Sequence, residues 1–273
     1  MKKTILFSAY ILCVMFIFSA CKKNDILSTK ENCRVLSTSV TSTSAGGANY
    51  TTNYKYDAKG YISSESTDLG GLLEIKFSRD DKGKLISSDS YYMGDFVSKE
   101  KFNYTNGRIS KVEIFDPSNN PIGVHNIKYN SAGDIIEFTN EYGDPAYDDK
   151  NLFEYNADRV QTKYTRADLS GKILSYVITK PVGAPGKASE IYLIDHGLPY
   201  QMIFNYAYSV AEPGVGSTFE VYFPNASGNM VMQETLKTKA ISTNSRGFTR
   251  EVVLANLAGA TLQTVKYEFE NCN

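Results

Sequence analysis

The sequence predicts an all-β protein, in which an antiparallel meander of repeated β-hairpins forms one large curved sheet. The composition favours strands, because the 273 residues include 20 Tyr, 14 Phe and 20 Gly and no Trp. A short pattern of aromatic residues, a polar turn and an apolar residue recurs at nearly constant spacing, which is typical of repeat architectures. No segment carries the periodicity of a long helix. The sequence leaves open whether the sheet closes into a barrel or packs as two layers.

Five copies of this pattern lie between about residues 50 and 180. Each copy has a turn position held by glycine, with Asp158 taken as standing in for glycine in the last one. These positions are 23, 24, 26 and 25 residues apart. They are Gly60, Gly83, Gly107, Gly133 and Asp158, within the units Tyr54–Ile62, Phe77–Leu85, Phe102–Ile109, Ile127–Ile135 and Phe153–Val160.

The residues of each unit specify a hairpin. Aromatic or β-branched residues two apart, such as Tyr54 and Tyr56, point to the same face of a strand. Asp or Asn then starts a turn by hydrogen bonding to its own backbone, and glycine supplies the positive φ that closes the turn. Strands joined by tight turns are antiparallel, so the region of the repeats is predicted to be a meander.

The second half continues in strands without clear repeats. A segment rich in Pro and Gly, over residues 180–187, is the predicted break in the sheet. Residues 33–273 are nevertheless expected to form a single β domain, with repeats over about 50–180 and non-repeating strands over about 188–273. The strands predicted in this half are 189–194, 200–208, 217–223, 230–241, 247–256 and 261–270.

The chain begins with a segment that has the features of a bacterial lipoprotein signal. Two lysines precede an apolar stretch over residues 5–18, and small residues stand just before Cys21. The stretch is shorter than the roughly 20 apolar residues that a membrane span needs. We therefore expect a signal peptide over 1–20, lipidation of Cys21, and a polar tether over 21–32 after cleavage. The alternatives are an ordinary secreted protein and a retained membrane span.

The cysteine positions favour an oxidising compartment. Signal removal deletes Cys13 and lipidation uses Cys21, so Cys33 and Cys272 remain, near the two ends of the domain. We predict that these two form a disulfide, and the alternative is two free thiols. Neither lies in a Cys-x-x-Cys pattern or near a histidine, so neither metal binding nor redox catalysis is expected.

The charge balance argues against nucleic-acid binding. Removal of Lys2 and Lys3 lowers the 29 basic residues to 27 against 30 acidic ones, a formal charge of about −3 for the mature chain. The sequence shows no basic stripe that could follow a phosphate backbone.

Two of the units resemble the YD or RHS repeat, whose unit is Tyr-Asp-x-x-Gly-Arg-Leu followed by a strand. Tyr56–Gly60 and Tyr129–Gly133 carry the resemblance, and Arg79 stands where that family has tyrosine. The resemblance covers roughly half of the chain. It implies a fold of wound β-hairpins and does not imply an activity.

The ends of the chain carry a second resemblance. Cys21-Lys-Lys-Asn-Asp is similar to the start of lipoproteins from Bacteroidota, and Cys33-Arg-Val and Asn271-Cys272 are similar to the two ends of small lipid-anchored proteins from that group. This resemblance implies a location at the outer membrane and no established activity. The sequence does not decide whether the protein faces the periplasm or the cell surface.

No catalytic constellation is found, and the protein is not expected to be an enzyme or to hold a cofactor or metal. A Ser/His/Asp hydrolase would need His125 or His196 as its base. A glycosidase pair or a calcium site would have to come from Asp144, Asp148 and Asp149, which are clustered in one loop and lack the spacing of a calcium loop. Solvated loop carboxylates are the simpler interpretation, and a carbohydrate-active hydrolase is the minority hypothesis.

Binding is the favoured hypothesis, because tyrosines offer flat amphipathic surface at low entropic cost. The alternative is that most of the tyrosines are core or cross-strand residues. A glycan binder would expose a strip of tyrosines, whereas a scaffold for an envelope protein would expose an apolar patch or a strand edge. The sequence therefore predicts a non-catalytic binding or scaffold module. The tyrosines proposed for the binding face are Tyr91, Tyr92, Tyr142, Tyr147, Tyr206 and Tyr208.

Overall fold

The computed structural model describes residues 34–43, 49–68, 70–182, 186–187, 211–212, 215–245 and 249–270. All of them belong to one compact unit, Cys33–Asn273, while a second unit, Met1–Asn32, lies outside them. Several predictions therefore fall outside the described residues. These are the signal peptide, the tether, Cys21, Cys33, Cys272, His196, Tyr206, Tyr208 and the strands at 189–194 and 200–208.

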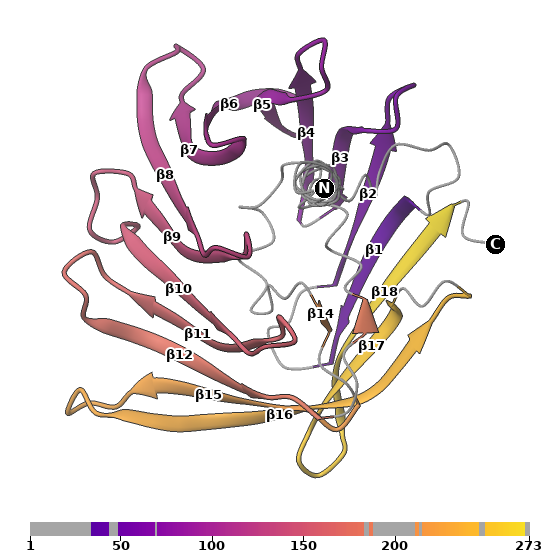
Figure 1. The fold of residues 1–273 in the computed structure, drawn as a ribbon, viewed down its shortest axis with the longest axis vertical. Coiled ribbons are helices and arrows are strands. Elements are labelled where there is room, and N and C mark those ends of the chain that lie inside the picture. The colour runs from indigo at the N-terminus through magenta and orange to yellow at the C-terminus, as the bar shows by residue number, and fades with distance from the viewer. Residues whose placement is uncertain are drawn as a thin grey trace, which may run out of the picture. The chain divides into compact units, whose positions relative to one another are not determined.

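Sixteen antiparallel strands follow one another around a closed barrel, as Figure 1 shows from indigo β1 to yellow β18. The predicted antiparallel all-β fold is confirmed, and the sheet closes into a barrel. Among the described residues, no helix is long and apolar enough to cross a membrane. The wall strands are β1 (Arg34–Ser42), β2 (Tyr50–Tyr56), β3 (Ile62–Asp68), β4 (Leu72–Arg79), β5 (Leu85–Tyr92), β6 (Asp95–Thr105), β7 (Arg108–Phe115), β8 (Pro121–Tyr129), β9 (Ile135–Glu141), β10 (Asp149–Tyr155), β11 (Gln161–Ala167), β12 (Ile173–Lys180), β15 (Thr218–Pro224), β16 (Met230–Thr243), β17 (Thr249–Asn256) and β18 (Thr261–Glu270).

The pairing of strands departs from simple sequence order at two places. β1 pairs with β18, which closes the barrel, and β12 pairs directly with β15. The predicted break after Lys180 therefore falls between two neighbouring wall strands. The two short strands between them, β13 (Gly186–Lys187) and β14 (Ala211–Glu212), form a separate two-stranded sheet.

Alternate residues of the wall point to opposite faces, and in several strands one face is buried and the other is exposed. In β7, Val112 and Ile114 are buried, whereas the side chain of Glu113 between them is 36% exposed. Side chains on the inside of a closed sheet crowd one another, so we assign the buried face to the barrel interior. The opposite face is the outer wall, and it carries charged residues that pair across strands.

The barrel has two ends, which are named here by their connections. The turn end carries the hairpins at 57–61, 80–84, 106–107, 130–134 and 156–160. It also carries the start of β1, the end of β12, the start of β15, the end of β16, the start of β17 and the end of β18. The loop end carries the connections at 69–71, 93–94, 116–120, 142–148, 168–172, 225–229 and 256–260. Each name includes the two strand residues on either side of a connection.

Candidate functional site

The turns of the repeats share one hydrogen-bonding geometry. In the first of them, Asp57 Oδ1 accepts from the backbone N–H groups of Lys59 and Tyr61, both at 2.9 Å, and Gly60 has φ of 91°. The turn that begins at Asp80 uses the same atoms, and in the turn that begins at Asn130 the Asn130 Oδ1 accepts from the N–H of Asp134. Gly83 and Gly133 have positive φ in these turns. An L side chain rarely adopts this φ, which explains glycine at these positions.

The third turn differs from this shared geometry, and the fifth turn differs at the position that glycine holds. Gly107 follows Asn106 in a two-residue turn, and both have positive φ, as a tight hairpin requires. In the last repeat the prediction was wrong by one residue, because Arg159, with φ of 61°, takes the glycine position in place of Asp158. The turn begins at Asn156, whose Oδ1 accepts from the N–H groups of Asp158 and Val160. Arg159 is therefore the fourth residue of this turn, the position that glycine holds in the turns at Asp57, Asp80 and Asn130.

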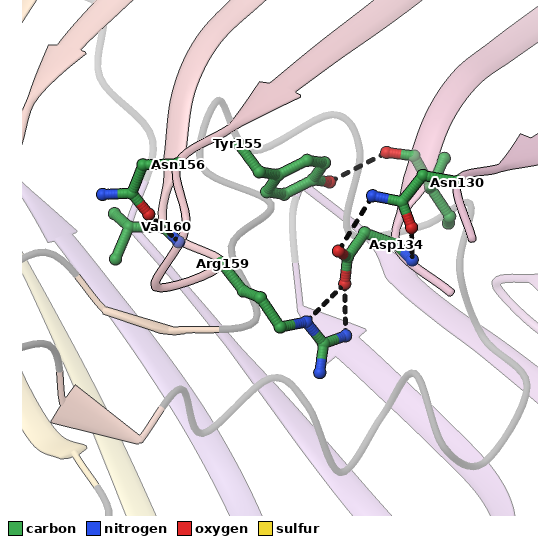
Figure 2. Close-up of polar contacts among 7 residues, drawn as sticks. Asn130, Asp134, Tyr155, Asn156, Arg159 and Val160 are labelled. Atoms are coloured by element: carbon green, nitrogen blue, oxygen red, sulfur yellow. Dashed lines mark hydrogen bonds and ion pairs between the residues drawn. The ribbon is translucent and has the colours of Figure 1, made fainter. Parts of the chain in front are cut away.

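A tyrosine hydroxyl joins the first repeat to β1, and others join the third, fourth and fifth repeats each to the repeat before. Figure 2 shows the last case, in which Tyr155 donates to the carbonyl of Ile135 at 2.9 Å and Arg159 pairs with Asp134. The same contact recurs from Tyr129 to Ile109, from Tyr104 to Leu85 and from Tyr56 to Val35, at 2.7 to 2.9 Å. The residues of the repeat motif therefore hold neighbouring hairpins together at the turn end.

We expect Tyr155→Phe to lower the free energy of unfolding by about 1 kcal/mol, because it leaves a buried carbonyl without its donor. Partial burial raises the pKa of Tyr155. Tyr147→Phe is the matched control, since Tyr147 is 67% exposed. Urea unfolding of both variants measures the difference, and equal stabilities would contradict a structural role for the hydroxyl contact.

A network of buried polar side chains lies on the inner face toward the loop end. Its centre is Asp149, which is 5% exposed. Asp149 accepts from Asn140 at 2.6 Å, from Asn151 at 2.9 Å and from Arg166 Nε at 2.5 Å. The Tyr164 hydroxyl extends the network by donating to Asn151 at 2.6 Å. These contacts satisfy the Asp149 carboxylate within the wall.

His125 lies beside this network and is 1% exposed. Its ring packs on Phe138 at 5.0 Å and meets the edge of Tyr142 at 5.7 Å. Burial lowers the pKa of His125 to about 4, and the opposing effects of Asn140 and the Asp149 charge are smaller. His125 is therefore neutral at neutral pH.

This burial predicts a stability change with pH. Unfolded histidine has a pKa near 6.5, so between pH 6.5 and about 4 the unfolded state binds a proton that the folded state does not. The contribution of neutral His125 to the free energy of unfolding is therefore complete above pH 6.5. It is lost as the pH drops toward 4, and the loss amounts to about 3 kcal/mol. Urea unfolding across this range should show the loss in the native chain and its absence in His125→Gln, and equal slopes for both would contradict it.

The candidate catalytic residues within the described part of the chain do not converge. Asp149 points inward and pairs with Arg166. Asp144 Oδ1 accepts from the N–H of Ala146, and Asp148 Oδ1 accepts from the N–H of Tyr142. These two carboxylates therefore order the loop backbone. Within the described residues, no group of three or more His, Cys, Asp or Glu side chains is placed to hold a metal ion.

All four described tyrosines of the proposed binding face lie at the loop end, but they do not form one exposed strip. Tyr91 packs against Phe96 and under the Lys76 ammonium. Tyr92 donates to the carbonyl of Gly70, and Tyr142 covers His125. Tyr147 is the most exposed of the four. The other three make packing or hydrogen-bond contacts, as the alternative of core and cross-strand tyrosines predicts.

Large apolar side chains are nevertheless exposed at this end. The three most exposed of those described are Leu257, Tyr147 and Met93, at 69%, 67% and 66%, and all three are at loop-end connections. Others at the same end are Leu72, Tyr92, Ile122, Tyr142, Leu169, Ile173 and Phe223. The loop end therefore offers apolar contact surface around the ring of strands.

The structure also shows an aromatic pair that the sequence analysis missed. Tyr176 and Tyr222 are opposite each other on β12 and β15, with ring centroids 4.4 Å apart and an interplanar angle of 20°. Tyr176 shares a face of β12 with Ile178, and Tyr222 shares a face of β15 with Glu220, because the members of each pair are two residues apart. This period of two was the signal available in the sequence. The pairing of β12 with β15 across 37 intervening residues of chain could not be predicted from local pattern.

No protein-family profile matches the chain, and no curated protein matches it. Among solved structures, the chain is similar to a porin-like protein from Bacteroides uniformis ATCC 8492, with a TM-score of 0.54 and 11% identity over 86% of this chain and 98% of that one. A porin-like protein from Bacteroides vulgatus ATCC 8482 gives 0.40 at 9% identity, over 88% and 99%. The complex TcdB2-TccC3-Cdc42 gives 0.24 at 11%, over 79% of this chain and 13% of that one. At this identity, the likeness to the Bacteroides uniformis protein shows a shared fold.

Proposed function

We propose that this protein is a non-catalytic binding module of the bacterial cell envelope, held at the outer membrane by lipid on Cys21. The observation that supports this most is a closed barrel with a buried inner face and a charged outer wall. The described carboxylates Asp144 and Asp148 cap loop backbone and Asp149 is satisfied within an interior network, which favours binding over chemistry. The fold shared with a porin-like protein of Bacteroides agrees with an envelope location.

The outer wall favours a lipid anchor over a barrel that spans the membrane. A wall that faces lipid carries an apolar band about 25 Å tall. Here the outer face carries Lys128 paired with Glu137 at 2.8 Å and Lys163 paired with Glu154 at 3.2 Å. Ionised side chains are costly in hydrocarbon, so we infer that this wall faces water.

The closed sheet limits how a partner can bind. Every described wall strand is paired on both sides, so the wall offers no strand edge for a peptide to extend. A partner must then use the loops or the outer face. A protein partner and a glycan both remain candidates, because the loop end exposes apolar and tyrosine side chains together.

Lipidation is tested by growth with an alkyne-bearing fatty acid and detection of the mature chain. The native protein should take up the label and pellet with membranes, whereas Cys21→Ser should do neither. Label retained in Cys21→Ser would contradict the anchor.

The binding role is tested with the lipidated protein in detergent-solubilised envelopes, followed by mass spectrometry of captured proteins, alongside a glycan array. A specific envelope partner with a blank array favours a scaffold. A glycan hit without a protein partner favours a glycan-binding module. The absence of both would argue against the proposal.

A further inference from the structure

We propose that the loop end is the docking surface, and that it binds a basic polypeptide segment with apolar side chains between its charges. This inference rests on the proposed binding function and adds the place and the chemistry of the partner. It stands on two observations, the exposed apolar side chains described above and a separation of charge between the two ends of the barrel.

The loop end is acidic. Apart from the Asp149–Arg166 pair, its described basic residues are Lys150 and Lys172, and its described acidic residues are Asp68, Asp95, Asp116, Glu141, Asp144, Asp148 and Asp168. Hydrogen bonds from Asn120 lower the pKa of Asp116, and hydrogen bonds from Ser170 and Lys172 lower that of Asp168. Both carboxyls are therefore charged at neutral pH.

The turn end is richer in basic residues. Its described acidic residues are Asp57, Asp80, Asp81, Asp134, Glu154, Asp158 and Glu270. Its described basic residues are Arg34, Lys55, Lys59, Arg79, Lys82, Lys84, Arg108, Lys128, Arg159, Lys180 and Arg250. The chain enters the barrel at this end, through Arg34.

This arrangement favours a basic protein segment over the other occupants. An anionic lipid surface would be repelled by the acidic loop end, and a second loop end would be repelled in the same way. Acidic and apolar groups side by side complement a segment that carries Lys or Arg between apolar side chains. Leu257, Tyr147 and Met93 would supply the apolar contacts, and the acidic residues would supply orientation.

The probe is a fluorescent peptide of alternating lysine and leucine, with glutamate–leucine and serine–leucine peptides of equal length as controls. Binding to the full mature chain in detergent is measured by fluorescence anisotropy at low and high salt. The lysine–leucine peptide should bind most tightly, and its affinity should fall as salt rises, because exposed charges are screened.

Two triple variants distinguish an effect of charge at the loop end from an effect of the net charge of the whole protein. Asp116→Asn, Asp144→Asn and Asp168→Asn remove three charges at the loop end and keep the side-chain oxygen that caps each turn. Asp57→Asn, Asp80→Asn and Asp81→Asn make the same change at the turn end. We expect at least a tenfold loss of affinity in the first triple variant and less than a twofold change in the second.

A second pair of variants tests the apolar contacts. Tyr147→Ser with Leu257→Ser should weaken binding about tenfold with an unchanged salt dependence. Ile86→Ser with Ile136→Ser, two exposed apolar residues near the turn end, should leave it unchanged.

Equal losses in the two triple variants, or no binding of the lysine–leucine peptide, would overturn this inference. So would tighter binding of the glutamate–leucine peptide or of phosphatidylglycerol vesicles, or association of copies abolished by the loop-end variants. A glycan-array hit without peptide binding would overturn the basic partner and leave the broader binding function standing. Failure of both assays would count against both proposals.

Discussion

Replacing Cys33 and Cys272 together by serine is expected to lower the free energy of unfolding by up to about 5 kcal/mol. The expected result follows from a predicted disulfide between these two residues, which would close a loop of nearly the whole domain. In the chain-entropy relation, a crosslink across so long a loop removes much of the freedom of the unfolded chain. The effect is therefore among the largest that any single change in this protein should produce.

The predicted disulfide would have a structural role at the seam of the barrel. β1 and β18 are the strands that close the barrel, with Arg34 opposite Glu270 and their charged groups 3.5 Å apart. Cys33 directly precedes Arg34, and Cys272 follows Glu270 by two residues. A covalent link beside the seam would keep the first and last strands paired while the rest of the wall fluctuates.

Intact-mass measurement with alkylation, before and after reduction, checks whether the bond forms. The unreduced native chain should take up no alkyl group at either residue. The stability change is then read from urea unfolding of the double serine variant beside the native chain. Two free thiols in the unreduced protein would show that the prediction is wrong.

The local sequence pattern was sufficient to predict where the hairpin turns lie. The spacing of Gly60, Gly83, Gly107 and Gly133 placed four turns correctly, because each turn is specified by residues within five positions of one another. Asp158 was misplaced because the unit Phe153–Val160 has no glycine. Counting from Asn156, the residue that starts the turn, would have given Arg159.

Contacts between distant parts of the chain could not be predicted from the local sequence pattern. Closure depends on pairing of β1 with β18, and the acidic residues of the loop end come from five different connections. Neither follows from the periodicity of any one segment. The interior network is a further case, because Asn140, Asp149 and Arg166 come from three strands and each reads as an ordinary polar residue in the sequence.

Phe138→Ala is expected to lower the free energy of unfolding by about 4 kcal/mol, because truncation of a fully buried ring loses its burial and leaves a cavity. Phe138 is 0% exposed on the inner face, where its ring packs on His125. Phe115→Ala is the matched control. Phe115 lies on the outer wall under the Lys101 ammonium, 4.3 Å away, and is half-buried, so about 1 kcal/mol is expected.

The contrast between these two variants bears on function as well as stability. A barrel of sixteen strands is wide enough to hold a water-filled channel when its interior is left open. In that case Phe138 would border water, and both variants would cost similar, small amounts in urea unfolding. A cost several times larger for Phe138→Ala would show that the face of the wall that carries Phe138 is packed and dry. The outer face and the loop end would then be the surfaces left for a partner, as a binding module requires and a channel does not.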